Sequence, residues 1–303
     1  MPRPSGAVSD MSRFPFQRIA IIGLGLMGGS LALALRQRGF DGSLFGADQS
    51  AANLALAGSA QKTSAEPVFD ALVADAAALP WSEIDLLVLA VPPAALPFYY
   101  ALAAGQLSAA AIVTDLASVK GEHVAQAEAL LGSRFLSSHP LIGAERQGFA
   151  AARAELYTDY RCVLCPGTES DGAVEEALRQ FWQALGAQVI VLSSTDHDQA
   201  LAATSHLPHL LASTYLALLA DDASLEELAG SGLRDFSRIA ASDPPLWAEI
   251  LGQNRVAVLH WLRRLQGQLA LVEAELAKND QAALRSTLAR GQAARARFHF
   301  PAG

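Results

Sequence analysis

Charged side chains and cysteines are both scarce in this chain of 303 residues. Asp, Glu, Lys and Arg make up 17% of the sequence, whereas an ordinary soluble domain is about one-quarter charged. The formal net charge of −8 argues against a nucleic-acid partner, because binding to a phosphate backbone requires clustered Lys and Arg. Cys162 and Cys165 are the only cysteines, so the sequence has no disulfide framework and we expect a cytoplasmic protein.

Long hydrophobic runs are absent as well, although 51% of the residues are hydrophobic. The longest stretch without a charge covers residues 86–114, and prolines at positions 92, 93 and 97 interrupt it. A membrane-spanning helix needs about 20 mostly apolar residues in one run, so we expect no membrane segment. Residues 1–16 lack the apolar core of a signal peptide and are expected to form a flexible leader, within which Met11 is a second candidate for the start.

Short apolar segments alternate with helical patterns over the first two-thirds of the chain. We expect strands over residues 17–23, 43–48, 85–91, 111–115, 135–138, 161–164 and 188–192. This alternation is typical of an α/β fold with a doubly wound, mostly parallel sheet that is buried on both faces. Beyond residue 196 the sequence predicts only helices, over residues 198–219, 246–277 and 280–297. We therefore predict a leader over residues 1–16, an α/β domain over residues 17–193 and an all-α domain over residues 194–303.

A glycine-rich turn follows the first expected strand. Gly23, Gly25 and Gly28 fit G-x-G-x-x-G, and a helical pattern begins directly after them. In a Rossmann-like domain these glycines permit a tight turn, a close approach of the backbone to a pyrophosphate, and close packing of helix on strand. Asp48 matches the acidic residue that accepts hydrogen bonds from the ribose hydroxyls of NAD and repels the extra phosphate of NADP. The sequence therefore predicts an NAD-binding domain, with a glycine turn that merely packs as the alternative.

His139 comes directly after the strand expected at residues 135–138. Ligands of open α/β sheets bind beyond the carboxyl ends of the strands. An imidazole in such a place can act as a base or as a hydrogen-bond acceptor near neutral pH. His139 is thus a candidate catalytic residue, and a histidine that caps a loop is the alternative.

Two further polar groups lie in the helical part. His206 and His209 are three residues apart, which places them on one helix face, and Pro208 suits a first helical turn. A zinc site needs three or four protein ligands, so we predict no metal and instead a carboxylate-binding role, with local hydrogen bonding as the alternative. Arg234 carries the planar fork that binds a carboxylate at two points, although a surface pair with Asp235 would give the same sequence.

The two cysteines form a C-x-x-C pattern inside an expected strand. Side chains three residues apart on a strand point to opposite faces, whereas a redox motif lies at the start of a helix. We therefore interpret Cys162 and Cys165 as structural residues.

Taken together, these motifs resemble the prephenate dehydrogenase (TyrA) family over about residues 17–300. The segments that carry the resemblance are GLGLMGGSLA (23–32), LAVPP (89–93), TDLASVKG (114–121), SHPLIGAERQG (138–148), DHDQALAATSHLPH (196–209), GLRDFSRIAASDPPLW (232–247) and the later Asn254-Arg255. The resemblance implies a Rossmann-like nucleotide-binding domain followed by a helical substrate-binding and dimerisation domain. It also implies NAD-dependent oxidative decarboxylation of prephenate to 4-hydroxyphenylpyruvate, with CO2 and NADH as the other products, in tyrosine biosynthesis.

The resemblance also implies roles for individual residues. His139 matches the family's catalytic histidine, which would accept a hydrogen bond from the ring hydroxyl, and Ser118 matches a serine near that hydroxyl and the nicotinamide. Arg234 and His209 match groups that hold a substrate carboxylate. The other implied site residues are Ser205 and His206 in the same pocket, Glu145 and Asp198 at its entrance, and Gly23, Gly25, Leu26, Met27, Gly28, Asp48, Val91 and Pro92 around the cofactor.

Three other functions stay open at this stage. A relative that prefers arogenate would form tyrosine directly, and the sequence does not distinguish it from an enzyme for prephenate. A hydroxyacid dehydrogenase of the 6-phosphogluconate type would need a lysine base in the helical domain, where Lys278 is the only lysine. A nucleotide-sensing scaffold without activity would have no need for His139, the histidine pair and Arg234 together.

The surplus of apolar residues points to a partner. Within residues 246–277 the apolar positions that recur every three or four residues are Val256, Leu259, Leu262, Leu265, Leu269, Val272 and Leu276. One small domain has little use for so many. The family resemblance implies a homodimer, so we predict a large apolar dimer interface of obligate type in the helical part.

Overall fold

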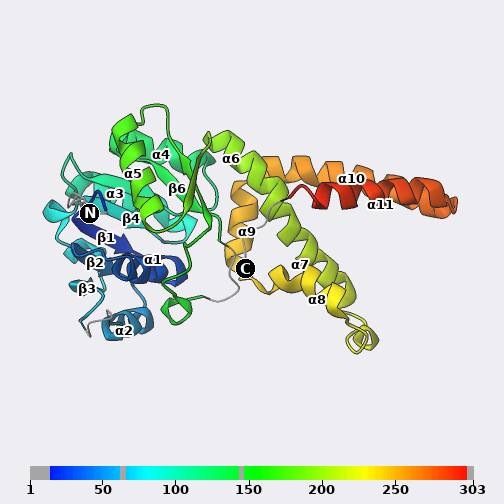
Figure 1. The fold of residues 1–303 in the computed structure, drawn as a ribbon, viewed down its shortest axis with the longest axis horizontal. Helices are drawn as coiled ribbons and strands as arrows, with labels where there is room; N and C mark the ends of the chain where they lie inside the picture. Colours follow the sequence, from blue (N-terminus) through cyan, green and yellow to red (C-terminus); the bar gives the residue numbers. More distant parts are fainter. Residues whose placement is uncertain (1–13, 62–65, 143–146, 299–303) are drawn as a thin grey trace, which may run out of the picture.

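The computed structural model describes residues 14–61, 66–142 and 147–298. Figure 1 shows two halves of different architecture, an α/β half with two sheets and a half built from helices alone. The helical half begins with α6 (Ser194–Leu201), directly after the last strand. The predicted fold class, a Rossmann-like α/β domain followed by helices, is confirmed.

The first sheet contains five parallel strands in the order β3-β2-β1-β4-β5. Its elements are β1 (Arg18–Ile22), α1 (Leu26–Gln37), β2 (Ser43–Ala47), α2 (Ala51–Ser59), β3 (Ala71–Val73), β4 (Leu86–Leu89), α3 (Leu96–Gln106), β5 (Ile112–Asp115) and α4 (Gly121–Leu131). The central strand β1 pairs with β2 on one side and with β4 on the other, so the strand order reverses beside it. Such a switch point is where open α/β sheets bind ligands. The sequence analysis missed β3, which is only three residues long and only partly buried.

The remaining strands form a separate sheet, which corrects the prediction of one continuous parallel sheet. Its elements are β6 (Ser137–Pro140), β7 (Arg161–Cys165), α5 (Gly172–Ala184) and β8 (Gln188–Val191). β6 runs antiparallel to β7, whereas β7 and β8 are parallel. The two sheets meet where Leu136 donates a hydrogen bond to the carbonyl of Val113 at 3.1 Å. Hydrophobic periodicity identifies a strand but not the strand that it pairs with, so the sequence could not separate the two sheets.

The two cysteines lie on β7, as predicted, and both are buried. Burial raises the pKa of Cys165 to about 12, and it also raises the pKa of Cys162. A thiol with a raised pKa is a poor nucleophile. The structural interpretation of the pair is therefore confirmed.

The end of the predicted leader is packed rather than flexible. Phe14 and Phe16 are 2% and 5% exposed and belong to the main hydrophobic core. Their rings make edge contacts with Phe40 and Phe181 at centroid distances of 5.6 and 5.8 Å. Burial of two aromatic rings stabilises this segment in a packed conformation, although the residues before it are polar. Residues 1–13 of the predicted leader lie outside the described residues.

The helical half consists of six α-helices and a π-helical turn within the described residues. Its elements are α6 (Ser194–Leu201), the π turn Ala202–His206, α7 (Leu207–Leu219), α8 (Ser231–Ser237), α9 (Pro244–Gln253), α10 (Arg255–Ala277) and α11 (Gln281–Arg295). Figure 1 shows α10 and α11 side by side as an arm that extends away from the α/β half. The short 3-10 turns among the residues that the structure describes are Ala76–Ala78, Trp81–Glu83, Pro93–Ala95, Gly132–Arg134, Phe149–Ala151, Ala223–Leu225 and Arg238–Ala241.

The helix predicted over residues 246–277 is interrupted at Asn254, which separates α9 from α10. Asn254 is 5% exposed, and its side-chain amide donates to the carbonyl of Asp198 at 2.8 Å and contacts His206 Nδ1 at 3.0 Å. The interruption therefore has a local cause, since Asn254 uses its side chain to join α9 and α10 to α6 and the π turn.

The hydrophobic cores of the two halves differ greatly in size. Two large clusters of buried side chains fill the α/β half. The cluster in the helical half contains only Ala202, Ala257 and Val258 as buried members. None of the helices in the described ranges is long and apolar enough to cross a membrane.

Candidate active site

The glycine turn between β1 and α1 has the geometry of a phosphate-binding turn. Gly23 has φ +92°, and a Cβ there would collide with the carbonyl of Ala90. A Cβ at Gly28 would collide with the carbonyl oxygen of Gly23. At Gly25, by contrast, a Cβ would meet nothing within 4 Å. The first and third glycines are thus required for packing, while the second faces open space that a pyrophosphate can approach.

The amino-terminal end of α1 points into this open space. α1 begins at Leu26, followed by Met27, and no side chain caps it within the described residues. The N-terminal amides of an uncapped helix favour an anion. Val91 and the exposed Pro92 follow the neighbouring strand β4, and Val91 lies against Gly23. The predicted cofactor-binding residues are therefore grouped at the carboxyl ends of β1 and β4, and their arrangement fits a dinucleotide.

Asp48 lies at the end of β2 and supports the glycine turn. Its Oδ2 accepts hydrogen bonds from the backbone N–H of Leu24 at 2.6 Å and from the Asn53 amide at 3.1 Å. Its Oδ1 accepts from the backbone N–H of Ser50 at 2.7 Å. A carboxylate has about four acceptor positions, so Asp48 retains capacity for a ribose hydroxyl. The side chain is partly exposed, as a ligand contact requires.

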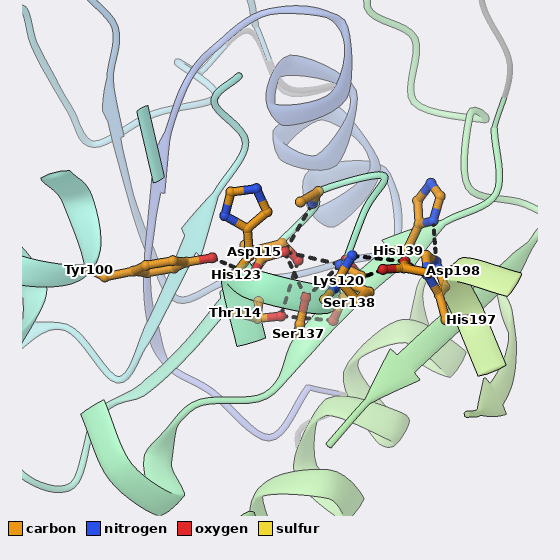
Figure 2. Close-up of polar contacts among 12 residues, drawn as sticks. Tyr100, Thr114, Asp115, Lys120, His123, Ser137, Ser138, His139, His197 and Asp198 are labelled. Atoms are coloured by element: carbon orange, nitrogen blue, oxygen red, sulfur yellow. Dashed lines mark hydrogen bonds and ion pairs between the residues drawn. The ribbon is translucent and has the colours of Figure 1, made fainter. Parts of the chain in front are cut away.

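His139 lies on β6 and is joined to two residues of α6. His139 Nδ1 is 2.8 Å from His197 Nε2, and His197 Nδ1 is 2.8 Å from Asp198 Oδ1 (Figure 2). His139 is 8% exposed and His197 is fully buried. Burial lowers the pKa of His139 well below its usual value, and the nearby groups His197, Lys120 and His206 lower it further. His139 is therefore neutral near pH 7 and able to accept a proton.

Lys120 is the centre of a buried polar cluster beside this chain of residues (Figure 2). Its Nζ donates to Asp115 Oδ1 at 3.1 Å, to Ser137 Oγ at 2.5 Å and to the carbonyl of Ser138 at 2.8 Å. Burial alone would raise the pKa of Asp115, but the Lys120 ammonium and several hydrogen bonds lower it. Because Ser138 immediately precedes His139, the cluster fixes the backbone that carries the candidate base.

Two residues complete the surroundings of this cluster. Tyr100 donates its hydroxyl to Asp115 Oδ2 at 2.7 Å, and burial followed by the charge of Asp115 raises the pKa of Tyr100. Ser118 lies two residues before Lys120, on the loop between β5 and α4, and is partly exposed. The predicted serine is thus at the same edge of the fold as His139.

His206 and His209 lie at the π turn and in the first turn of α7. The π turn ends at His206, and such turns are frequent at functional sites. Burial lowers the pKa of His206 to about 4. The ring of His209 stacks on Trp247 at a centroid distance of 3.5 Å, and its Nδ1 donates to the carbonyl of Ser205 at 2.9 Å. The pair is held by these separate contacts, and His206 is 1% exposed while His209 is partly exposed.

Asp198, which the family resemblance places at the pocket entrance, is 13% exposed and is engaged in several hydrogen bonds. Its oxygens accept from the backbone N–H groups of Lys120 at 3.0 Å and Gly121 at 2.8 Å, as well as from His197. Burial would raise the pKa of Asp198, but the hydrogen bonds from His197, Gly121 and Lys120 lower it. Asp198 therefore anchors α6 to the start of α4. Glu145, the other residue expected at the entrance, lies outside the described residues.

Arg234 is not grouped with the other predicted site residues. Its side chain is 77% exposed and pairs with its neighbour Asp235 at 3.2 Å, which is the surface arrangement considered as the alternative. A different arginine lies near the histidine pair: burial lowers the pKa of His209, the hydrogen bond to Ser205 opposes this, and the charge of Arg238 lowers the pKa further. The structure thus associates Arg238, one turn further along, with the predicted carboxylate pocket.

Comparison with known proteins identifies the family. A family model described as the nucleotide-binding domain of prephenate dehydrogenase matches residues 31–191, and one described as its dimerization domain matches residues 193–290. The chain belongs to the prephenate dehydrogenase family. Prephenate dehydrogenases are NAD-dependent oxidoreductases, so the predicted enzyme class is confirmed.

Individual relatives extend over most of the chain. A cyclohexadienyl dehydrogenase of Zymomonas mobilis is 30% identical over 88% of this chain and 90% of its own length. A prephenate dehydrogenase of Bacillus subtilis is 30% identical over 86% of this chain and 71% of its own length.

Two solved structures share this fold. The prephenate dehydrogenase of A. aeolicus in complex with hydroxyphenyl propionate and NAD+ has a TM-score of 0.85 and 28% identity, over 92% of this chain and 97% of its own. The arogenate dehydrogenase of Synechocystis has a TM-score of 0.77 and 28% identity, over 93% of this chain and 100% of its own. The family therefore includes relatives named for prephenate and for arogenate.

Sequence reasoning missed several residues of this candidate site. They are Lys120, His197, Arg238, Trp247 and Asn254. Lys120 and His197 stand next to predicted residues in the sequence, and a buried lysine or histidine gives no signal of its own there. For Arg238 a signal did exist, because it follows Arg234 by four residues and so lies on nearly the same helix face.

Proposed function

We propose that this chain catalyses the NAD-dependent oxidative decarboxylation of prephenate to 4-hydroxyphenylpyruvate. The observation that carries the proposal is the neutral, buried His139 at the ligand-binding edge of the α/β half, within reach of a hydrogen-bonded network from α6. NAD, when bound at the glycine turn, supplies the acceptor for the hydride that leaves the ring carbon bearing the hydroxyl. Gly23, Gly25, Leu26, Met27, Gly28, Asp48, Val91 and Pro92 would hold it.

His139 acts as the base in this proposal. Its Nε2 accepts the proton of the ring hydroxyl as hydride departs from the same carbon. The ring carboxylate then leaves as CO2, the electron pair of the broken bond completes the aromatic ring, and the proton held by His139 returns to the phenolate oxygen of the product. Ser118 orients the hydroxyl from the loop after β5. Because aromatisation drives the reaction, the protein mainly orients the substrate and holds one proton until the aromatic ring has formed.

The substrate carboxylate would be bound beside the histidine pair. His209 lies against Trp247, and Ser205 and His206 border the same π turn. Arg238 is the better placed arginine, since its charge reaches His209, while Arg234 remains the candidate from sequence. Arg238→Gln is expected to raise KM by about 10-fold or more with little change in kcat, whereas Arg234→Gln has a smaller effect. A larger rise in KM for Arg234→Gln would return the role to that residue.

A steady-state assay of the purified protein tests the central claim. It uses NAD or NADP as the cofactor and prephenate or arogenate as the substrate, and it follows the reduced cofactor. We expect NADH formation with prephenate, and His139→Asn is expected to lower kcat at least about 100-fold with a modest change in KM. Failure of both substrates would exclude the proposed function, and equal activity with NADP would contradict the role given to Asp48.

Arogenate is the second candidate substrate. Relatives named as cyclohexadienyl and arogenate dehydrogenases match this chain about as well as those named for prephenate. Arogenate differs in its side chain, which carries an ammonium group in place of the keto group. The same assay separates the two, because a preference of kcat/KM for arogenate would reassign the substrate without altering the chemistry at the ring.

We also propose that the chain divides near residue 194 and that the helical half forms a homodimer. The two matching family models adjoin at residues 191 and 193, and the second is described as a dimerization domain. Large apolar side chains are exposed on α10, among them Val256, Leu269 and Leu276 at 72%, 57% and 62%. Such a surface is typical of an interface in an obligate oligomer.

A further inference from the structure

The hydrogen bonds that lead to His139 start at two backbone N–H groups, which can act only as donors. The backbone N–H groups of Lys120 and Gly121 can only donate, and both donate to Asp198 at 3.0 and 2.8 Å. These amides belong to the amino-terminal end of α4, where a negative charge is favoured. Asp198 is therefore an ionised acceptor, in agreement with its lowered pKa.

The same assignment of donor and acceptor can be extended to the two ring nitrogens of His197. An ionised Asp198 only accepts, so the hydrogen at 2.8 Å must lie on His197 Nδ1. Burial lowers the pKa of His197, although the hydrogen bond to Asp198 opposes this, so the ring is neutral and carries one hydrogen. His197 Nε2 is then a bare acceptor. His139 Nδ1, at 2.8 Å from it, must be the donor.

These hydrogen bonds also determine the protonation of His139 Nε2, the nitrogen proposed to act as the base. A neutral imidazole with its hydrogen on Nδ1 has a free lone pair on Nε2. The opposite tautomer of His139 would place two lone pairs against each other at His197 and would offer an N–H, not a base, to the substrate. The correct tautomer is thus determined by residues on α6 and at the start of α4, at some distance from the substrate.

We propose that His197 is a positioning residue that holds His139 with Nδ1 protonated and Nε2 free, through a relay that runs from the α4 amides to Asp198, His197 and His139. The relay joins the two halves of the molecule, because His139 lies on β6 while His197 and Asp198 lie on α6 (Figure 2). Lys120 also holds the backbone next to His139, because its Nζ donates a hydrogen bond to the carbonyl of Ser138. The catalytic part of this inference depends on the proposed function, but the assignment of tautomers does not.

Other histidines in the same protein provide internal references. Asn254 Nδ2 donates to the carbonyl of Asp198 at 2.8 Å, which identifies that atom as nitrogen, and it also faces His206 Nδ1 at 3.0 Å. His206 Nδ1 must therefore accept, and His206 carries its hydrogen on Nε2. His209 Nδ1 faces the carbonyl of Ser205 and must donate. His139, His197 and His209 are thus expected as one tautomer and His206 as the other.

Nitrogen NMR of the full chain labelled with 15N at histidine measures these tautomers directly. Single His→Asn variants assign the signals at positions 139, 197, 206 and 209. At pH 7.5 we expect a protonated Nδ1 and an unprotonated Nε2 for His139 and His197, and the reverse for His206. A His139 ring with its hydrogen on Nε2, or a doubly protonated ring, would overturn the relay.

Kinetics supply the second arm, with a matched control. His197→Leu removes the acceptor at similar volume and is expected to lower kcat by about 10²- to 10⁴-fold, while KM for prephenate stays within about threefold. His123 is a buried histidine on α4 outside the relay, bonded through Nε2 to Gln253, so His123→Leu is expected to leave kcat within about threefold. Equal losses in both variants would assign His197 a purely structural role.

The outcomes for the two proposals are separable. If neither prephenate nor arogenate is oxidised, the proposed function fails whatever the tautomers are. If the enzyme turns over while His139 carries its hydrogen on Nε2, the relay fails and the function stands. If His197→Leu does not fold, the NMR measurement on the unmodified protein still shows whether His139 has the tautomer that the relay requires.

Discussion

The two halves of this protein bury their hydrophobic residues in different ways. In the α/β half, strands such as β4 are fully buried, and two large clusters of side chains surround the first sheet. In the helical half, α10 buries only Ala257 and Val258, and α11 buries no residue at all. Most of the exposed large hydrophobic side chains of the described chain belong to this half. The α/β half thus buries most of its large apolar side chains, whereas the helical half exposes many of its own, as the proposed dimer interface requires.

The largest expected effect comes from breaking that surface. Leu269→Glu combined with Leu276→Glu places two carboxylates in the proposed interface of α10, where unpaired charge costs several kcal/mol, at least about 100-fold in Kd. We expect a dimer for the unmodified protein and a monomer for the variant at micromolar concentration, measured by size-exclusion chromatography with light scattering.

The matched control lies in the other half. Phe98 on α3 is 65% exposed, so Phe98→Glu places one carboxylate at a similarly exposed apolar position outside the proposed interface. This variant is expected to remain dimeric. A monomeric wild-type protein, or dissociation by Phe98→Glu, would contradict the assignment of the interface to the helical half.

The next largest effect is expected on stability, when one ion pair from each half is broken. Lys120 and Asp115 are both fully buried, so Lys120→Met leaves an unpaired carboxylate inside the α/β half and is expected to cost about 3–5 kcal/mol of unfolding free energy. The pair of Arg234 and Asp235 on α8 is 77% and 72% exposed, and Arg234→Met is expected to cost less than about 1 kcal/mol. Urea denaturation at one fixed protein concentration measures both.

A double variant distinguishes the lost charge from lost packing. Asp115→Asn in the background of Lys120→Met removes the uncompensated carboxylate and should restore part of the stability. The amide oxygen introduced by Asp115→Asn would still accept the hydroxyl of Tyr100, so that contact is retained. No recovery in the double variant would indicate that Lys120 acts through its packing and its bonds to Ser137 and Ser138 instead.

The comparison of the halves also explains what the sequence could predict. Strands β1, β2, β4 and β5 were predicted because each buries a short, continuous apolar run, and the glycine turn was predicted because backbone geometry demands glycine there. The division into two sheets depends on which strands pair, and pairing over long sequence separations leaves no local pattern.

The candidate site was predicted less completely for a related reason. His139, Ser118 and the histidine pair stand out by residue type and by family resemblance. The residues that orient His139 are distant in sequence. His197 on α6 contacts His139 across 58 residues, and Lys120 before α4 contacts the carbonyl of Ser138 across 18 residues. Arg234 was chosen for its place in the Gly-Leu-Arg-Asp segment, whereas the nearness of Arg238 to His209 is a property of the fold that the sequence does not display.

The smallest expected effect is a pH dependence of stability at the seam between the halves. Burial lowers the pKa of His206 to about 4, against 6.5 for a histidine in the unfolded chain. Between these values the unfolded state binds the proton more readily, so stability is lost as the pH falls from about 6.5 towards 4. His206 alone is expected to contribute a loss of about 2 kcal/mol between pH 7 and pH 5. His139, His197 and His209 have lowered pKa values and add effects of the same sign.

Thermal denaturation at a series of pH values measures this slope, and two variants attribute it. His206→Gln retains an acceptor for the Asn254 amide but does not titrate, so we expect a flatter dependence between pH 7 and pH 5. His260 lies exposed on α10, and His260→Gln is expected to leave the slope unchanged. The lowered pKa values of Asp115 and Asp198 act below this window, since an unfolded carboxyl titrates near pH 4. A slope that persists in His206→Gln would therefore place the titrating group among the other three histidines with lowered pKa values, of which His139 and His197 belong to the relay.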